Sequence, residues 1–100
     1  MPKDSPQTND YDLIIIGAGI GGLIMLQHAR AAGLKAVILE KRSVPGGLWN
    51  DLPSWQDIQS RKEDWTVNDF PISSEWQPDV LANIGHWARH YDLESDIHYG

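Results

Sequence analysis

The sequence predicts an α/β fold, in which buried parallel strands are joined by a helix. Leu13–Ile16 are four apolar residues, three of them β-branched, which is typical of a strand buried on both faces of a parallel sheet. A glycine-rich turn follows. From Ile20 to about Ala32 the chain has the length and apolar content of a helix, and Gly33 suits the left-handed residue that often ends one. A second apolar run, Ala36–Leu39, completes a strand–helix–strand unit.

The turn after the first strand has the pattern G-x-G-x-x-G, with its glycines at positions 17, 19 and 22. In dinucleotide-binding folds these three glycines permit the tight turn, the approach of backbone to a pyrophosphate, and the close packing of helix on strand. The helix that begins here also directs free N–H groups and the positive end of its dipole at a phosphate. We therefore expect a dinucleotide pyrophosphate against the backbone of Gly17, Gly19, Ile20, Gly21 and Gly22.

Glu40, directly after the second strand, makes the glycine pattern far more specific. It lies 23 positions after Gly17, close to the roughly 20 that a dinucleotide fold expects. Its carboxylate is placed to accept hydrogen bonds from both ribose hydroxyls of an adenosine and to repel a 2′-phosphate, so FAD and NAD fit and NADP is disfavoured. Lys41 is either a cation near the adenosine or pyrophosphate or part of a solvated turn, and for Arg42 we expect the solvated turn. The alternative to a dinucleotide site is a structural strand–helix–strand turn that binds nothing.

Composition narrows the class of partner and of chemistry. The chain has 100 residues and a net charge of −6, which argues against nucleic acid and anionic membrane as partners. It has no cysteine, so thiol chemistry and thiolate metal sites are excluded. Residues 1–10 are polar and are expected to form a flexible tail, not a signal peptide. The apolar run from Leu13 to Leu26 is too short to span a bilayer, and we expect a cytoplasmic protein.

The second half of the chain predicts a loop, a helix and a further strand. Asn50–Pro71 shows no sustained periodicity. Between Trp76 and Leu93 apolar residues recur at spacings of three and four, which predicts a helix with Pro78 at its first position. His86 and His90 share a helix face without a third ligand, so we expect no metal site. The chain has five tryptophans, more than we expect so small a fold to cover, so further chain or a partner is expected to supply the missing surface.

A second glycine pair, Gly46-Gly47, follows Glu40 closely and is itself followed by Leu48-Trp49. This arrangement resembles FAD enzymes of the glutathione-reductase-like class, where that backbone passes close to the flavin end of the cofactor. The form G-G-L-W resembles the flavin-containing monooxygenases in particular, whereas amine oxidases and desaturases more often have G-G-R. The resemblance implies that Gly47, Leu48 and Trp49 lie beside the flavin.

The loop that follows continues this resemblance. Lys62-Glu63 and Asp69-Phe70-Pro71 match a monooxygenase segment in which an Asn-Thr-Ser-Lys-Glu run precedes Asp-Phe-Pro. Gln59 then falls where the family has a flavin-proximal Asn that stabilises the oxygen adduct, and Ser60 falls where it has Thr. Gln59 has the same amide chemistry on a longer side chain, so it is the candidate catalytic residue and Ser60 a candidate cofactor contact. The alternative for Gln59 is an exposed loop amide.

The resemblance covers residues 11–100 and implies an activity. It implies the N-terminal part of a Rossmann-like FAD-binding domain of the glutathione-reductase-like class, in a flavoprotein monooxygenase. NADPH would reduce FAD, and O2 would add to the flavin as a peroxide that oxygenates a small organic substrate. The second G-x-G-x-x-G that binds NADPH and the family's F-x-G-x-x-x-H signature are absent from these residues. We therefore expect an incomplete domain, inactive alone, which further chain or a second subunit completes and which binds NADPH elsewhere.

Two other functions remain open from the sequence. One is another FAD-dependent oxidoreductase, of the amine oxidase or dehydrogenase type, against which Leu48-Trp49 argues. The other is a non-catalytic flavin-binding subunit or fragment that docks on a larger partner.

Overall fold

The computed structural model describes residues 11–100, so the flexible tail predicted for residues 1–10 lies outside the described residues. The helices and strands are, in chain order, β1 (Leu13–Ile16), α1 (Ile20–Ala31), β2 (Ala36–Glu40), α2 (Gln77–His90) and β3 (Ile97–Tyr99). Short 3-10 turns lie at Gly47–Asn50, Lys62–Asp64 and Leu93–Asp96.

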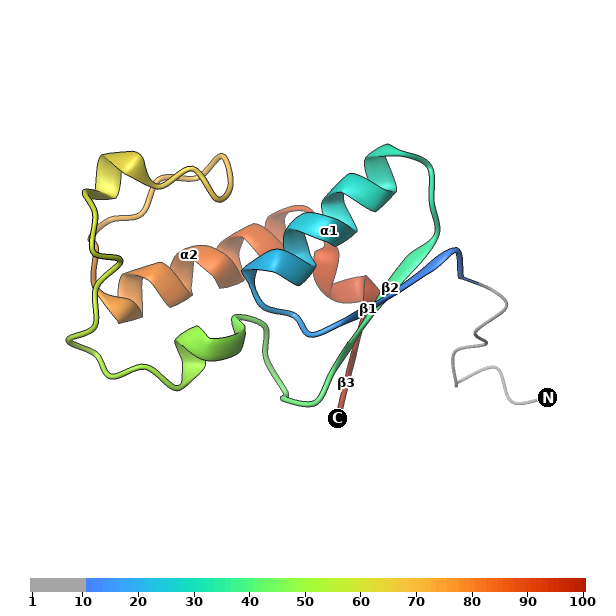
Figure 1. The fold of residues 1–100 in the computed structure, drawn as a ribbon, viewed down its shortest axis with the longest axis horizontal. Coiled ribbons are helices and arrows are strands. Elements are labelled where there is room, and N and C mark those ends of the chain that lie inside the picture. Colours follow the sequence, from blue (N-terminus) through green and yellow to red (C-terminus); the bar gives the residue numbers. More distant parts are fainter. Residues whose placement is uncertain (1–10) are drawn as a thin grey trace.

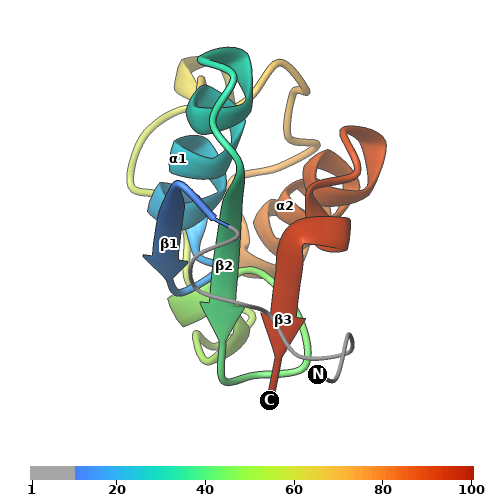
Figure 2. The same ribbon diagram turned by 90° about the vertical axis from the view of Figure 1, so that its right-hand side faces the viewer.

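The strands form one parallel three-stranded sheet in the order β1-β2-β3. Leu13 pairs with Ala36 at the start of β1, and Glu40 pairs with Tyr99 at the end of β3. Helix α1 connects the first two strands, as Figures 1 and 2 show. The predicted α/β fold with a Rossmann-like strand–helix–strand unit is therefore confirmed. The first two predicted strands and the first helix agree with the structure to within one residue, and the further strand predicted after the second helix is β3.

Both helices pack on the same face of the sheet, where they enclose the core (Figure 2). The largest fully buried side chains of this core come from α1, β2 and α2, with one from the turn before β3: Leu23, Leu26, Ile38, Val80, Ile84, Trp87 and Leu93. Apolar side chains from three strands and two helices thus meet in one cluster, and their removal from water is the main stabilising contribution.

The prediction that the first strand is buried on both faces is wrong in this structure. Ile15 is buried against the helices, but Ile14 and Ile16 point to the other face, where they are 38% and 79% exposed. The reason is that residues 11–100 place no helix over that face. An apolar run predicts that a strand is buried, but it does not identify the element that covers each face.

Helix α2 begins at Gln77, one residue before the predicted start, so Pro78 occupies its second position and not its first. Its predicted apolar face is buried, with Trp87 fully enclosed. Trp55 and Trp76 remain 72% and 49% exposed, in line with the surplus of tryptophan surface that the sequence indicates. Neither helix within residues 11–100 combines the length and the apolar character needed to cross a membrane.

The long loop between the Gly47–Asn50 turn and α2 runs around the end of α2 that lies away from the sheet (Figure 1). It is irregular, as predicted, apart from one short turn. Asn83 of α2 holds it in place, because its amide oxygen accepts from the Trp65 indole N–H at 3.1 Å and its amide nitrogen donates to the Phe70 carbonyl at 2.9 Å. These two hydrogen bonds fix the loop against the helix.

Candidate dinucleotide-binding site

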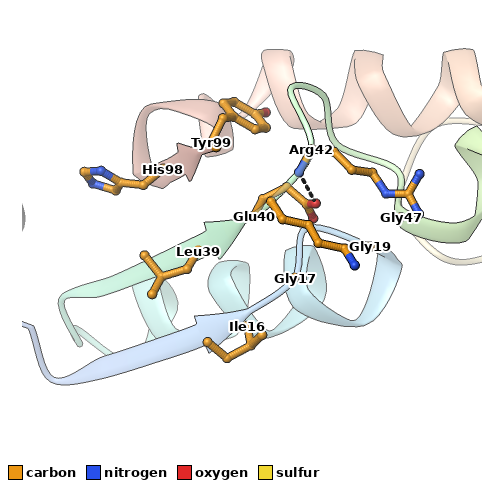
Figure 3. Close-up of a pocket in the computed structure, with 11 residues that line it drawn as sticks. Ile16, Gly17, Gly19, Leu39, Glu40, Arg42, Gly47, His98 and Tyr99 are labelled. Atoms are coloured by element: carbon orange, nitrogen blue, oxygen red, sulfur yellow. Dashed lines mark hydrogen bonds between the residues drawn. The ribbon is translucent and has the colours of Figure 1, made fainter.

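The candidate site is a hollow of about 690 Å³ at the edge of the sheet where all three strands end (Figure 3). Parallel strands bring their carboxyl ends to one edge, and helix α1 begins at this same edge. The hollow is lined by Ile16, Gly17, Gly19, Leu39, Glu40, Lys41, Arg42, Gly47, His98, Tyr99 and Gly100. Residues predicted to bind a dinucleotide from two separate glycine motifs therefore meet in one place.

The third glycine of the first motif has no room for a side chain. A Cβ atom on Gly22 would lie 2.0 Å from the Gly17 carbonyl oxygen, far inside van der Waals contact. Helix α1 can therefore start directly against the end of β1 only if this residue is glycine, which is the packing role expected for it. Its first turn contains no acidic side chain, so the positive end of the helix dipole remains available to an anion.

Glu40 is buried beneath the hollow and links the first glycine turn to the chain that follows β2. One carboxylate oxygen accepts from the Ala18 backbone N–H at 2.6 Å and the other from the Arg42 backbone N–H at 2.8 Å. Burial raises the pKa of Glu40, but these two backbone hydrogen bonds and the nearby cations outweigh it and leave the pKa below its ordinary value. Because a carboxylate offers about four acceptor positions, roughly two remain for a ligand.

The second glycine pair packs directly on the first glycine turn. The Gly46 N–H donates to the Ala18 carbonyl at 2.9 Å. Gly47 has a φ of +54°, and a Cβ atom on it would lie 3.0 Å from the Gly19 Cα. The sequence placed Gly46-Gly47 beside a flavin but did not indicate this contact, which shapes one wall of the hollow. The sequence signal for this contact is a glycine pair six and seven positions after Glu40.

Arg42 lies in the turn after β2, as expected, where it also forms an exposed ion pair that the sequence did not indicate. Its guanidinium makes two hydrogen bonds to the Asp51 carboxylate, at 2.7 and 2.6 Å, and its side chain is 31% exposed. This ion pair ties the chain after β2 to the end of the Gly47–Asn50 turn. Lys41 is exposed and lines the hollow, which agrees with both of its predicted alternatives, a cation near the ligand and a solvated turn.

A second hollow of about 490 Å³ brings the candidate flavin-side residues together. Its lining is Ile20, Leu48, Trp49, Leu52, Gln56, Asp57, Ile58, Gln59 and Trp65. Gln59 has a left-handed backbone with φ of +59°, held by a hydrogen bond from its N–H to the Asp57 carboxylate at 2.9 Å. For a non-glycine residue this conformation is strained, and strain of this kind concentrates at functional positions. Ser60 is exposed and lines neither hollow.

The two histidines of α2 lie on its exposed side and pack edge-on against Phe70, at ring-centroid distances of 4.5 Å for His86 and 4.9 Å for His90. Within residues 11–100, no three metal-binding side chains gather closely enough to hold an ion. This aromatic contact is the observed environment of the pair.

The fold and the hollow together define a nucleotide-binding strand–helix–strand unit. The chain belongs to the NAD(P)-binding Rossmann-like domain family, whose model matches residues 15–78. That match runs from β1 through both glycine motifs to the start of α2.

Known relatives of this chain include flavin enzymes. The FAD-binding monooxygenase acrE of Aspergillus aculeatus is 30% identical over 102 residues, which cover 89% of this chain and 16% of acrE. The solved structure of a steroid monooxygenase bound to NADP is 31% identical with a TM-score of 0.73, over 89% of this chain and 19% of that one. The dihydrolipoyl dehydrogenase of Synechocystis is 50% identical over 44 residues, 44% of this chain and 9% of the enzyme. The resemblance to flavin monooxygenases is thus confirmed, and this chain spans less than a fifth of the length of those two monooxygenases.

Proposed function

We propose that residues 11–100 are the N-terminal part of the FAD-binding domain of an NADPH-dependent flavoprotein monooxygenase acting on a small organic substrate. The observation that carries this proposal is the position of Glu40. Its carboxylate lies at the wall of a hollow formed by the first glycine turn, the second glycine pair and the ends of all three strands. Similarity to monooxygenases along nearly the whole chain supports the choice of reaction.

The residues present fit the adenosine and pyrophosphate of FAD. Glu40 keeps acceptor positions for ribose hydroxyls after its two backbone hydrogen bonds. The start of α1, at Gly19, Ile20 and Gly21, has no acidic side chain to compete with a pyrophosphate. Lys41, at the rim, adds a positive charge.

We assign the second hollow to the flavin ring, because its lining combines apolar and aromatic side chains with a few polar ones. Leu48 and Trp49 supply apolar surface, and Gln59 supplies an amide that can donate and accept hydrogen bonds. We assign Gln59 to the reactive side of the ring, and Ser60, its neighbour in the chain, remains a proposed cofactor contact. When bound, FAD would supply the redox chemistry between NADPH and O2, and these residues would bind it, orient it and exclude water.

The NADPH site is assigned to polypeptide outside this chain. Support comes from the length of the relatives, of which this chain covers 16% and 19%. The exposed Ile16 and Trp55 are surface that such polypeptide, in the same chain or a second subunit, would cover. These residues alone should therefore bind FAD without oxidising NADPH.

A dehydrogenase is the second candidate, because the identity with dihydrolipoyl dehydrogenase is 50% where the two sequences match. That match spans 44% of the chain, whereas the match with acrE spans 89%. The longer similarity favours the monooxygenase. Oxygen uptake by the complete protein with NADPH distinguishes the two, since a dehydrogenase reaction of that kind needs no O2.

The direct test is a titration of the purified protein with FAD and with FMN, followed by flavin fluorescence. FAD should bind with near-unit stoichiometry and FMN much more weakly, because FMN lacks the adenosine that Glu40 is assigned to hold. Glu40→Gln should weaken FAD at least tenfold, a loss of about 1.4 kcal/mol, and leave FMN unchanged. Glu63→Gln, an exposed carboxylate in the Lys62–Asp64 turn, is the matched control. Equal affinity for FAD and FMN, insensitive to Glu40→Gln, would contradict the proposal.

A further inference from the structure

Asp51, which does not line the hollow, neutralises one of the two positive charges beside it, that of Arg42. The ionisable side chains that line the hollow are those of Glu40, Lys41, Arg42, His98 and Tyr99. Asp51 lies outside, yet its carboxylate takes both ends of the Arg42 guanidinium, at 2.7 and 2.6 Å. Glu40 and Asp51 together offset Lys41 and Arg42, so the formal charge of the four is zero.

Arg42 is the natural partner for a phosphate at this place. A guanidinium binds phosphate through two parallel hydrogen bonds, and an arginine near the ribose is the usual means of accepting a 2′-phosphate in dinucleotide folds. The Arg42 backbone N–H is itself bonded to the Glu40 carboxylate, so the root of its side chain lies beside any ribose that Glu40 holds. Figure 3 shows the side chain directed instead from Glu40 toward Gly47.

We infer that Asp51 is a specificity-determining residue: by binding the Arg42 guanidinium, it keeps a phosphate-binding group away from the ribose and so excludes 2′-phosphorylated adenosines. The inference rests on the proposed function, because it requires that Glu40 hold an adenosine ribose. Asp51 acts through Arg42 and touches no ligand itself. Two features therefore exclude a 2′-phosphate: the repulsion by Glu40 and the sequestration of Arg42.

The test compares two ligands that differ only in the phosphate at issue, 5′-AMP and adenosine 2′,5′-bisphosphate. Their dissociation constants are measured by calorimetry for the wild type, Asp51→Asn, Arg42→Gln with Asp51→Asn, and Asp64→Asn. The last is the matched control, because Asp64 forms an exposed ion pair with Arg61, at 3.2 Å, and lines neither hollow. Circular dichroism melting of each variant verifies that it remains folded.

The wild type should prefer 5′-AMP. Asp51→Asn should shift the affinity ratio about tenfold toward the bisphosphate, as expected for one released charge-assisted contact. The double variant should return to the wild-type ratio, and Asp64→Asn should not change it. An unchanged ratio in Asp51→Asn, or an equal shift in the double variant, would overturn the role of Asp51 while leaving the adenosine site intact. Failure of the wild type to bind 5′-AMP would instead overturn the proposed function, and this inference with it.

Discussion

The close contact between the start of α1 and the end of β1 gives the sharpest prediction, through the substitution Gly22→Ala. The new Cβ would lie 2.0 Å from the Gly17 carbonyl oxygen and 3.1 Å from its carbonyl carbon, and both are backbone atoms. A flexible side chain could rotate away from such a clash, but this oxygen moves only if the glycine turn or the helix moves. Overpacking of a rigid site typically costs about 1–3 kcal/mol, and we expect the upper end of that range.

A loss of about 3 kcal/mol should lower the melting temperature by roughly 12–24 °C for a domain of this size. The assay is thermal and urea unfolding followed by circular dichroism. Gly21→Ala is the matched control for stability, because a Cβ on Gly21 meets nothing within 4 Å, and alanine is a better helix residue by about 0.5–1 kcal/mol. If Gly22→Ala melts within a few degrees of Gly21→Ala, the argument that the helix must start against Gly17 is wrong.

Three further substitutions test the rest of the site and the core. Glu40→Gln should cost about 1–3 kcal/mol in urea unfolding, because glutamine keeps only one acceptor oxygen and one of the two backbone N–H groups would face its NH2 group. Folding lowers the pKa of Glu40, so the ionised carboxylate stabilises the fold fully above the ordinary pKa of 4.5, and this stabilisation is lost as the pH falls through the lower folded pKa. In acid titrations the free energy of unfolding should therefore fall more steeply for the wild type than for Glu40→Gln. Gly47→Ala, with a Cβ 3.0 Å from the Gly19 Cα and a φ of +54°, should weaken FAD binding in fluorescence titrations by tenfold or more, and undiminished affinity would show that this contact does not shape the site. Trp87→Ala should cost about 3–5 kcal/mol in the same unfolding assay, because the side chain is fully buried and its indole N–H donates to the Gln27 side chain at 3.0 Å; a loss below 1 kcal/mol would contradict its place in the core.

The elements that the sequence predicted well are those with a local cause. A run of branched apolar residues predicts Leu13–Ile16, and the glycine turn and Gly33 bracket α1. The α2 face follows from periodicity over a single helix. Each of these patterns is complete within about fifteen residues, so no knowledge of the tertiary structure was needed.

What the sequence could not show depends on contacts between distant segments. Ile16 is exposed because both helices pack on the other face of the sheet, whereas the apolar composition of its strand predicts that it is buried. The packing of Gly47 on Gly19 and the pairing of Arg42 with Asp51 depend on how the chain after β2 turns back. For Glu40, spacing predicted a ligand contact, whereas the structure adds a hydrogen bond to Ala18 that joins two strand ends.

The most direct test of the central claim is an amide NMR titration of the 15N-labelled protein with FAD. The account predicts that the largest shift changes fall in three segments: residues 17–22, 40–42 and 46–49. They should weaken together in Glu40→Gln. Changes centred on α2, or spread evenly over the surface, would contradict the assignment of the hollow at the strand ends as the cofactor site.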